Sequence, residues 1–404
     1  MSLELIAYSL LGVFCGIFTG LVPGIHVNTA APLAMELSNS SFIEPMSASV
    51  FICCMSITHT FIDFIPATIL GIPDPDMSLA VLPAHRMVLS GRGWEAICLS
   101  GVASLLSVVI ITASLPLLMY VFEIIYPVIS SSTLYLLIFF SIITIYAHKS
   151  MKKIILALFV FLLSGIFGYA VLENTMLFKD PLMPVFSGFF GMSSLIMGLA
   201  GGKEVPKQDF DDLFLISKKN IIITTLKGTF SGILVSTVPG IGASQATILS
   251  NIFSRGDGEN GTRQFILSCC SINTSNALFA IIVLYLFQKP RNGALICVQE
   301  IMGDIRKEEL LLFVMVVVTS SFLAFLLLRV IAKIVLKNMG NIRYDILCIS
   351  GIVILTLLVY SLGGPLGILL CIISTSMGLM PPLLGVNRSV LMAFLLLPIM
   401  SYYI

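Results

Sequence analysis

The sequence of 404 residues has little charge, because Asp, Glu, Lys and Arg together make up only 11% of it. An ordinary soluble domain carries about 25%, so the composition excludes a soluble globular enzyme and a disordered protein. Basic residues number 22 and acidic residues 21, which leaves no positive surplus for a nucleic-acid backbone. We therefore predict no nucleic-acid partner.

Motifs for cofactors and metals are also missing. The nine cysteines form no CxxC pair and no cluster with histidine, so neither a zinc site nor a disulfide framework is indicated. The sequence has no GxxxxGK[ST] and no GxGxxG, the usual nucleotide-binding motifs. The first segment lacks the basic start and cleavage site of a signal peptide, so we expect it to remain as a membrane helix. These absences predict no cofactor, no metal and no enzyme.

What the sequence does contain is long stretches without a charged residue. Examples are 5–35, 96–122, 154–172 and 346–387, and a helix needs about 20 apolar residues to cross a bilayer. The last stretch is long enough for two crossings. Only helices and closed barrels satisfy their backbone hydrogen bonds in lipid. The sequence therefore predicts an all-α polytopic protein of the plasma (cytoplasmic) membrane.

The chain also repeats itself after 216 residues. Gly12–Ala34 and Gly228–Ser250 align without a gap and are identical at 10 of 23 positions, with Val-Pro-Gly-Ile in both. The register continues downstream, where Thr58 aligns with Thr274. Internal repeats of this kind are typical of secondary transporters.

The basic residues predict how the two repeats are oriented. Clusters near 86–92, 149–153 and 203–219 are separated by two apolar segments each, which places all three in the cytoplasm and the N-terminus outside. A cluster at 329–343 aligns with a turn that the first repeat places outside. Basic loops that change sides indicate two inverted-topology repeats. The predicted units are a first membrane repeat at 1–202, a cytoplasmic connecting loop at 203–219 and a second membrane repeat at 220–404.

Each repeat carries a Pro-Gly pair inside an apolar stretch. Proline removes a backbone donor and glycine permits irregular backbone, so one helix should end near Val22 and another should begin just after, capped by Asn28 or Thr29. Helix N-termini attract anions, so two broken or re-entrant helices that meet would form an anion pocket; a kink that serves packing alone is the alternative. The predicted substrate-binding residues here are Pro23, Gly24, His26, Asn28 and Thr29, with Pro239, Gly240, Gly242, Ser244 and Gln245.

Polar residues follow in the next apolar segment of each repeat. His59 and Asp63 are four residues apart and share one helix face, and ionisable residues at membrane depth usually line a pathway. Hydrogen bonding between helices is the alternative, as is a place for Asp63 near the water interface. We predict ion coupling by Thr58, His59, Asp63 and Thr274, and substrate binding by Asn273 and Asn276.

Several segments resemble the TctA family, the large permease subunit of tripartite tricarboxylate transporters. The paired Pro-Gly motifs of that family are similar to Gly20–Gly24 and Ser236–Gly242, and other segments of it resemble Ala67–Pro73, Gly91–Ala96 and Gly378–Gly385. The run Pro-Gly-Ile-His-x-Asn-Thr looks most like the shorter archaeal branch. The resemblance implies a cation-coupled importer of small carboxylates that works with a small membrane subunit and an extracytoplasmic binding protein.

Three functions remain open at this point. The first is a secondary-active permease that moves a small organic anion, a carboxylate by resemblance, coupled to Na⁺ or H⁺. The alternative is a translocase that flips a polyprenyl-phosphate lipid carrier, with Arg86 or Arg388 beside the phosphate. An intramembrane enzyme built from Ser56, His59 and Asp63 is the third, although no oxyanion motif or HExxH accompanies them. The sequence leaves the oligomeric state open, a homo-oligomer included.

Overall fold

A computed structural model describes residues 3–22, 27–40, 42–70, 81–148, 150–174, 181–201, 206–211, 215–238, 246–247, 258–339 and 344–403. Within these ranges it contains helices and no strand. Among the described residues, eight helices are long and apolar enough to cross a membrane, and up to nine if one bent pair forms a single span. The all-α polytopic prediction is therefore confirmed.

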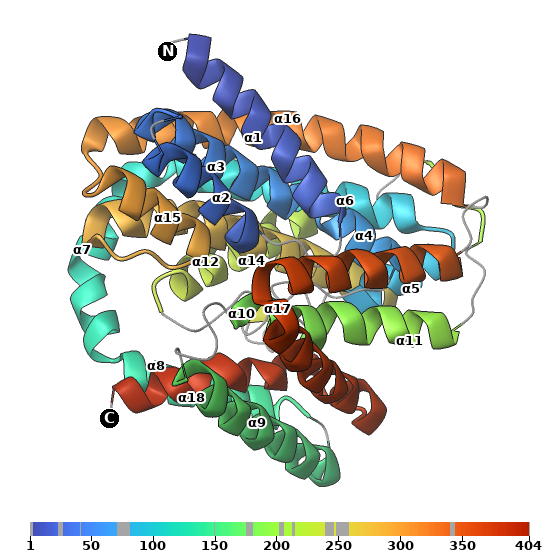
Figure 1. The fold of residues 1–404 in the computed structure, drawn as a ribbon. Helices are drawn as coiled ribbons and strands as arrows, with labels where there is room; N and C mark the ends of the chain where they lie inside the picture. The colour runs from blue at the N-terminus through green and yellow to red at the C-terminus, as the bar shows by residue number, and fades with distance from the viewer. Residues whose placement is uncertain are drawn as a thin grey trace.

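The described elements are shown in Figure 1. In chain order they are α1 (Leu3–Leu21), α2 (Val27–Asn39), α3 (Pro45–Ile62), α4 (Phe64–Leu70), α5 (Val81–Leu89), α6 (Gly93–Ala113), α7 (Leu115–Ser131), α8 (Thr133–Tyr146), α9 (Met151–Leu172), α10 (Leu182–Phe186), the π-helix η1 (Ser187–Met192), α11 (Ser193–Gly201), α12 (Lys218–Val235), α14 (Gly258–Phe287), α15 (Gly293–Met302), α16 (Lys307–Asn338), α17 (Tyr344–Leu384), the 3₁₀-helix η3 (Arg388–Met392) and α18 (Ala393–Tyr402).

Glycines bring α1 and α3 together. A Cβ added at Gly16 would lie 2.7 Å from Thr58 Cβ, and one added at Gly20 would lie 2.8 Å from Ile62 Cβ. Because the contacts advance in step along both helices, α1 and α3 run in the same direction. Small residues of this kind allow close packing in membranes, while the opposite face of α1 exposes large apolar side chains, including Phe14, as a lipid-facing helix would.

The second repeat builds the same pair from α12 and α14. A Cβ at Gly228 would meet Ser268 and Ser271, and one at Gly232 would meet Ile272 and Ser275. These contacts also advance in step, so α12 and α14 run in the same direction. The glycine helix of each repeat therefore packs in parallel on the helix that carries the repeated polar segment.

The helices α3 and α14, which align in the repeat, meet each other in opposite directions. Thr60 contacts Thr274, whereas Asp63, further along α3, contacts Asn273, earlier on α14. In the other direction, Cys53 on α3 and Ile281 on α14 line one cavity. The pairs α1–α3 and α12–α14 are consequently antiparallel to one another.

Helices near the end of each half of the chain pack against helices of the other half. In α9, Ser164 Oγ donates to the Leu391 carbonyl at 2.7 Å and Tyr169 to the Leu397 carbonyl at 3.0 Å, which ties α9 to η3 and α18. In α17, Ser374 Oγ lies 3.4 Å from the Pro184 carbonyl of α10. Each half thus packs its end on the other half, and Figure 1 shows α8, α9 and α18 grouped together, joined through α7 to the helices around α15.

The long helix α17 corrects one expectation. The stretch 346–387 was predicted to have room for two crossings, but Gly364 has φ 60° and ψ −157° and breaks the helix. Residues Gly363–Leu384 are long enough to span, whereas Cys348–Ser361 are not, because a crossing needs about 20 residues. The stretch therefore supplies one full span and one short helix.

A substitution in α9 tests the exchanged packing. Gly168→Ala would place a methyl group against the Phe394 backbone carbonyl, which cannot move like a side chain. We expect a loss of about 1–3 kcal/mol in the free energy of unfolding, visible as a lower melting temperature of the purified protein. Gly351→Ala is the control, because its methyl would meet only the Leu195 side chain. Equal melting temperatures for both variants would contradict the described α9–α18 contact.

Candidate functional site

The described ends of α1 and α12 both lie close to the α3–α14 contact. The first helix ends at Leu21, as the Pro-Gly pair predicts, and Gly20 beside that end lies against Ile62 and the Asp63 backbone. The second glycine helix ends at Val235, one turn beyond Gly232. The described ends of α1 and α12 therefore approach the same polar region from opposite directions.

The centre of this region is a pair of buried contacts between the repeats. Asn273 Nδ2 lies 3.4 Å from Asp63 Oδ2, and the Thr60 and Thr274 hydroxyl oxygens lie 3.4 Å apart. All four side chains are buried. A buried carboxylate is expensive unless it is hydrogen-bonded or bound to a cation, so this contact between repeats is where charge chemistry can occur.

His59 contacts the other neighbour of α3. Its Nδ1 lies 3.1 Å from Thr19 Oγ1 on α1, and the Thr19 hydroxyl donates to the Gly16 carbonyl. The imidazole thus links α3 to α1 close to the first break.

The remaining predicted side chains on these helices have different surroundings. Thr58 is fully buried against Gly16, and its hydroxyl has no hydrogen-bond partner among the described residues. Asn276 is half-buried on α14. Thr58 and Asn276 each lie within one helical turn of the contact between Thr60 and Thr274.

Part of the predicted anion pocket lies outside the described residues. This applies to Pro23, Gly24, His26, Pro239, Gly240, Gly242, Ser244 and Gln245, and to the side chains of Asn28 and Thr29. The backbone of α2 begins at Val27, so Asn28 and Thr29 lie inside its first turn. The expectation that one of them precedes and caps this helix is wrong, because the helix starts earlier than the polar residues.

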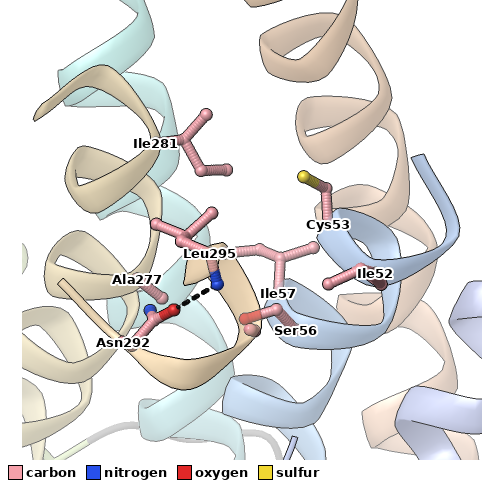
Figure 2. Close-up of a pocket in the computed structure, with 9 residues that line it drawn as sticks. Ile52, Cys53, Ser56, Ile57, Ala277, Ile281, Asn292 and Leu295 are labelled. Carbon is pink, nitrogen blue, oxygen red and sulfur yellow. Dashed lines mark hydrogen bonds between the residues drawn. The ribbon is translucent and has the colours of Figure 1, made fainter. Parts of the chain in front are cut away.

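A small cavity lies beside the crossing. Figure 2 shows Ser56 and Ile57 of α3 on one side of it and Ala277 and Asn292 on the other. Its volume of about 10 Å³ is the room of one water molecule, so it is far too small for a carboxylate substrate. Because Ser56 lines this cavity with α14 and α15 while His59 contacts α1, the structure does not arrange Ser56 and His59 around a common substrate space.

A network of charges joins the two repeats at one end of the bundle. Arg263 of α14 lies 2.8 Å from Glu95 of α6, and Arg92 and Glu259 extend the network toward solvent. Glu95 also accepts from the Leu215 backbone at 3.2 Å. The network ties the starts of α6 and α14 to the segment that connects the repeats.

The same end gathers basic residues from distant parts of the chain. Arg329 of α16 lies over the Trp94 ring at 5.7 Å, and Lys337 lies over the Phe210 ring at 5.9 Å. Gln208 holds the connecting segment in place by accepting from the Gly93 backbone at 2.9 Å. One face of the protein therefore gathers cations from the starts of α6 and α14 and from α16, beside the connecting segment.

Sequence reasoning gave no role to Thr19, Glu95 or Arg263, and it placed Thr60 among the polar residues of its segment without predicting it as a site residue. Thr60 could have been found, because Ser56, Thr60 and Asp63 follow the spacing of one helix face. The Glu95–Arg263 pair carries no such signal, since its members are 168 positions apart.

The fold and this site define a class, a multi-pass α-helical membrane protein in which α3 and α14 meet at buried polar side chains. The chain belongs to the tripartite tricarboxylate transporter TctA family, which it matches over residues 6–393. It is therefore a permease of a transporter family. The chain is 30% identical over 407 residues to the uncharacterized protein MJ1079 of Methanocaldococcus jannaschii, with 98% of each chain covered. No solved structure matches.

Proposed function

We propose that the chain is a secondary-active permease that moves a small carboxylate, with Na⁺ or H⁺ as the coupling ion. The observation that carries this proposal is the buried meeting of Asp63 with Asn273 and of Thr60 with Thr274, where the two repeats cross. A carboxylate with hydroxyl and amide oxygens nearby suits a hard cation or a proton. In this proposal the anion binds helix N-termini that follow the two Pro-Gly pairs.

The order of the contacts supports inverted repeats. Because α1 and α3 are parallel, α3 and α14 antiparallel, and α14 and α12 parallel, the aligned helices α1 and α12 point in opposite directions. Repeats related in this way place a substrate site at their interface near the middle of the membrane. We propose the boundaries 1–202 and 220–404 for them, with the loop at 203–219 between.

The charges support an orientation. The face that gathers Arg92, Arg263, Arg329 and Lys337 is the more basic end of the α6–α14–α16 group, and cytoplasmic ends carry such an excess. We propose that this face and the connecting loop are cytoplasmic. Since α14 starts at this face and α1 is antiparallel to it, the N-terminus would then lie outside.

Site roles in this proposal are those predicted from the sequence. The coupling ion binds Asp63, with Thr58, His59 and Thr274 around it, and Asn273 and Asn276 face the substrate. The carboxylate binds the helix ends formed by Pro23, Gly24, His26, Asn28 and Thr29 and by Pro239, Gly240, Gly242, Ser244 and Gln245. As the family name describes a tripartite transporter, the proposal includes a small membrane subunit and an extracytoplasmic binding protein as partners.

Thermal stabilisation of the purified protein tests the ligand class. A ligand that binds only the folded state adds about 2.7 kcal/mol at 100 times its dissociation constant. We expect citrate or another small carboxylate to raise the melting temperature, and we expect Na⁺ or a lower pH to enlarge the increase. An increase only with a short polyprenyl phosphate would replace the permease with the lipid-carrier translocase. No increase with any compound would contradict substrate binding by this chain alone.

A further inference from the structure

Arg388 lies where α17 passes into η3, with its side chain half-buried against α11. Its guanidinium donates to Ser194 Oγ and, at 3.4 Å, to Met197 Sδ. No carboxylate of the described residues lies within ion-pair distance of it. A guanidinium has five N–H donors, and a charge removed from water is normally paired. Within the described part of the chain, this cation therefore has no anion.

The backbone beside Arg388 is held in place by His148. The Asn387 N–H donates to His148 Nε2 at 3.0 Å, and His148 Nδ1 lies 3.0 Å from the Ile145 carbonyl. One ring nitrogen accepts and the other donates, so the imidazole is neutral. It fixes the position of the Arg388 main chain and supplies no counter-charge.

The surroundings of Arg388 place it at the edge of the apolar layer. The spans Met151–Leu172 and Gly363–Leu384 begin and end beside it. A Cβ added at Gly385 would lie 3.5 Å from Lys153 Nζ, so a second cation reaches the same turn. The exposed side chains around the turn include the apolar Met151, Met197 and Leu383, beside the exposed lysines Lys152 and Lys153. Exposed apolar side chains at the end of a span face lipid, so the open side of this basic group faces the lipid headgroup region.

We propose that Arg388, together with Lys153, binds the phosphate headgroup of an anionic membrane lipid. Arginine suits a phosphate because its fork can donate two parallel charge-assisted hydrogen bonds, and basic pockets between membrane helices bind anionic headgroups. The lipid would sit against α9, α11 and α17, which come from both repeats. It would be a resident lipid at the perimeter, and this proposal does not rest on the transported substrate.

Native mass spectrometry of the purified full chain, with phosphatidylglycerol and phosphatidylcholine added separately, tests this site. We expect the wild type to bind phosphatidylglycerol at least about tenfold more tightly than phosphatidylcholine, because both lipids carry a phosphate but the choline ammonium places a like charge beside Arg388 and Lys153. Arg388→Gln should remove most of this preference. Lys307→Gln is the matched control, because Lys307 is an exposed lysine at the start of another span, and it should bind as the wild type does.

Two further arms separate lipid binding from a structural role. Ser194→Ala removes the hydroxyl that Arg388 contacts but keeps the guanidinium, so it should retain phosphatidylglycerol; a loss as large as that of Arg388→Gln would overturn the proposal. Arg388→Lys keeps the charge without the fork, so it should bind with intermediate affinity, and it replaces Arg388→Gln if that variant does not elute as a single species. Unchanged binding by Arg388→Gln would overturn the proposal, as would displacement of the lipid by millimolar inorganic phosphate.

Discussion

Glu95→Leu is expected to lower the free energy of unfolding by about 3–5 kcal/mol, because removing one partner leaves the other charge buried. The Arg263 and Glu95 side chains are only 3% and 6% exposed and lie 2.8 Å apart. After the substitution, Arg263 would keep only Glu259, which is 79% exposed. The measurement is a denaturant titration of the purified protein in detergent, followed by circular dichroism.

A double substitution shows whether the charge itself is responsible. Glu95→Leu combined with Arg263→Met removes both charges, and apolar replacements of buried pairs are often close to neutral. We therefore expect the double variant to be more stable than Glu95→Leu alone. Arg306→Gln is the surface control, because the exposed Arg306 side chain lies 3.8 Å from Glu309. This substitution should change the free energy of unfolding by less than about 1 kcal/mol. Additive losses in the double variant would show that the pair is not coupled as the geometry indicates.

Asp63→Asn is expected to reduce gradient-driven uptake of a carboxylate by at least about tenfold. Its carboxylate is buried at the contact between the repeats. Removing the charge that binds a cation or proton should cost more free energy than the 1.4 kcal/mol that corresponds to a tenfold change. The amide keeps the size of the side chain, so the fold should remain. The measurement is the initial rate of uptake into proteoliposomes, with citrate or with whichever carboxylate raises the melting temperature of the protein.

A matched control is available on the same helix. Glu44 is exposed just before α3, so Glu44→Gln makes the same chemical change away from the site and should leave the rate unchanged. A second readout is the dependence of uptake on the gradient. If Asp63→Asn retained a wild-type rate with the same dependence on Na⁺ or pH, Asp63 would not be the coupling group.

Local features of the fold followed from the sequence. The end of α1 beside the Pro-Gly pair was predictable, because proline and glycine act on the backbone where they stand. The spacing of Gly12, Gly16 and Gly20 is typical of a closely packed helix face, although it does not predict which helix packs there or in which direction. The helical class followed from long charge-free stretches, because a helix needs about 20 apolar residues to cross a bilayer.

Contacts between distant segments could not be predicted from the sequence. Thr60 and Thr274 were visible as polar residues, but nothing in one sequence says that they meet 214 positions apart. The break of α17 at Gly364 is another case, since many glycines in membrane helices serve packing instead. The exchange of α18 and α11 between halves depends on how whole helices assemble, which a pattern along one chain does not encode.

The most direct test of the account is uptake by the purified chain in proteoliposomes, with an Na⁺ gradient, a proton gradient or neither. The account predicts that one of the two gradients drives carboxylate accumulation above the external concentration, and that Asp63→Asn abolishes this accumulation. Equal internal and external concentrations under every gradient, with the protein shown to be folded and to bind the carboxylate, would contradict ion-coupled transport by this chain.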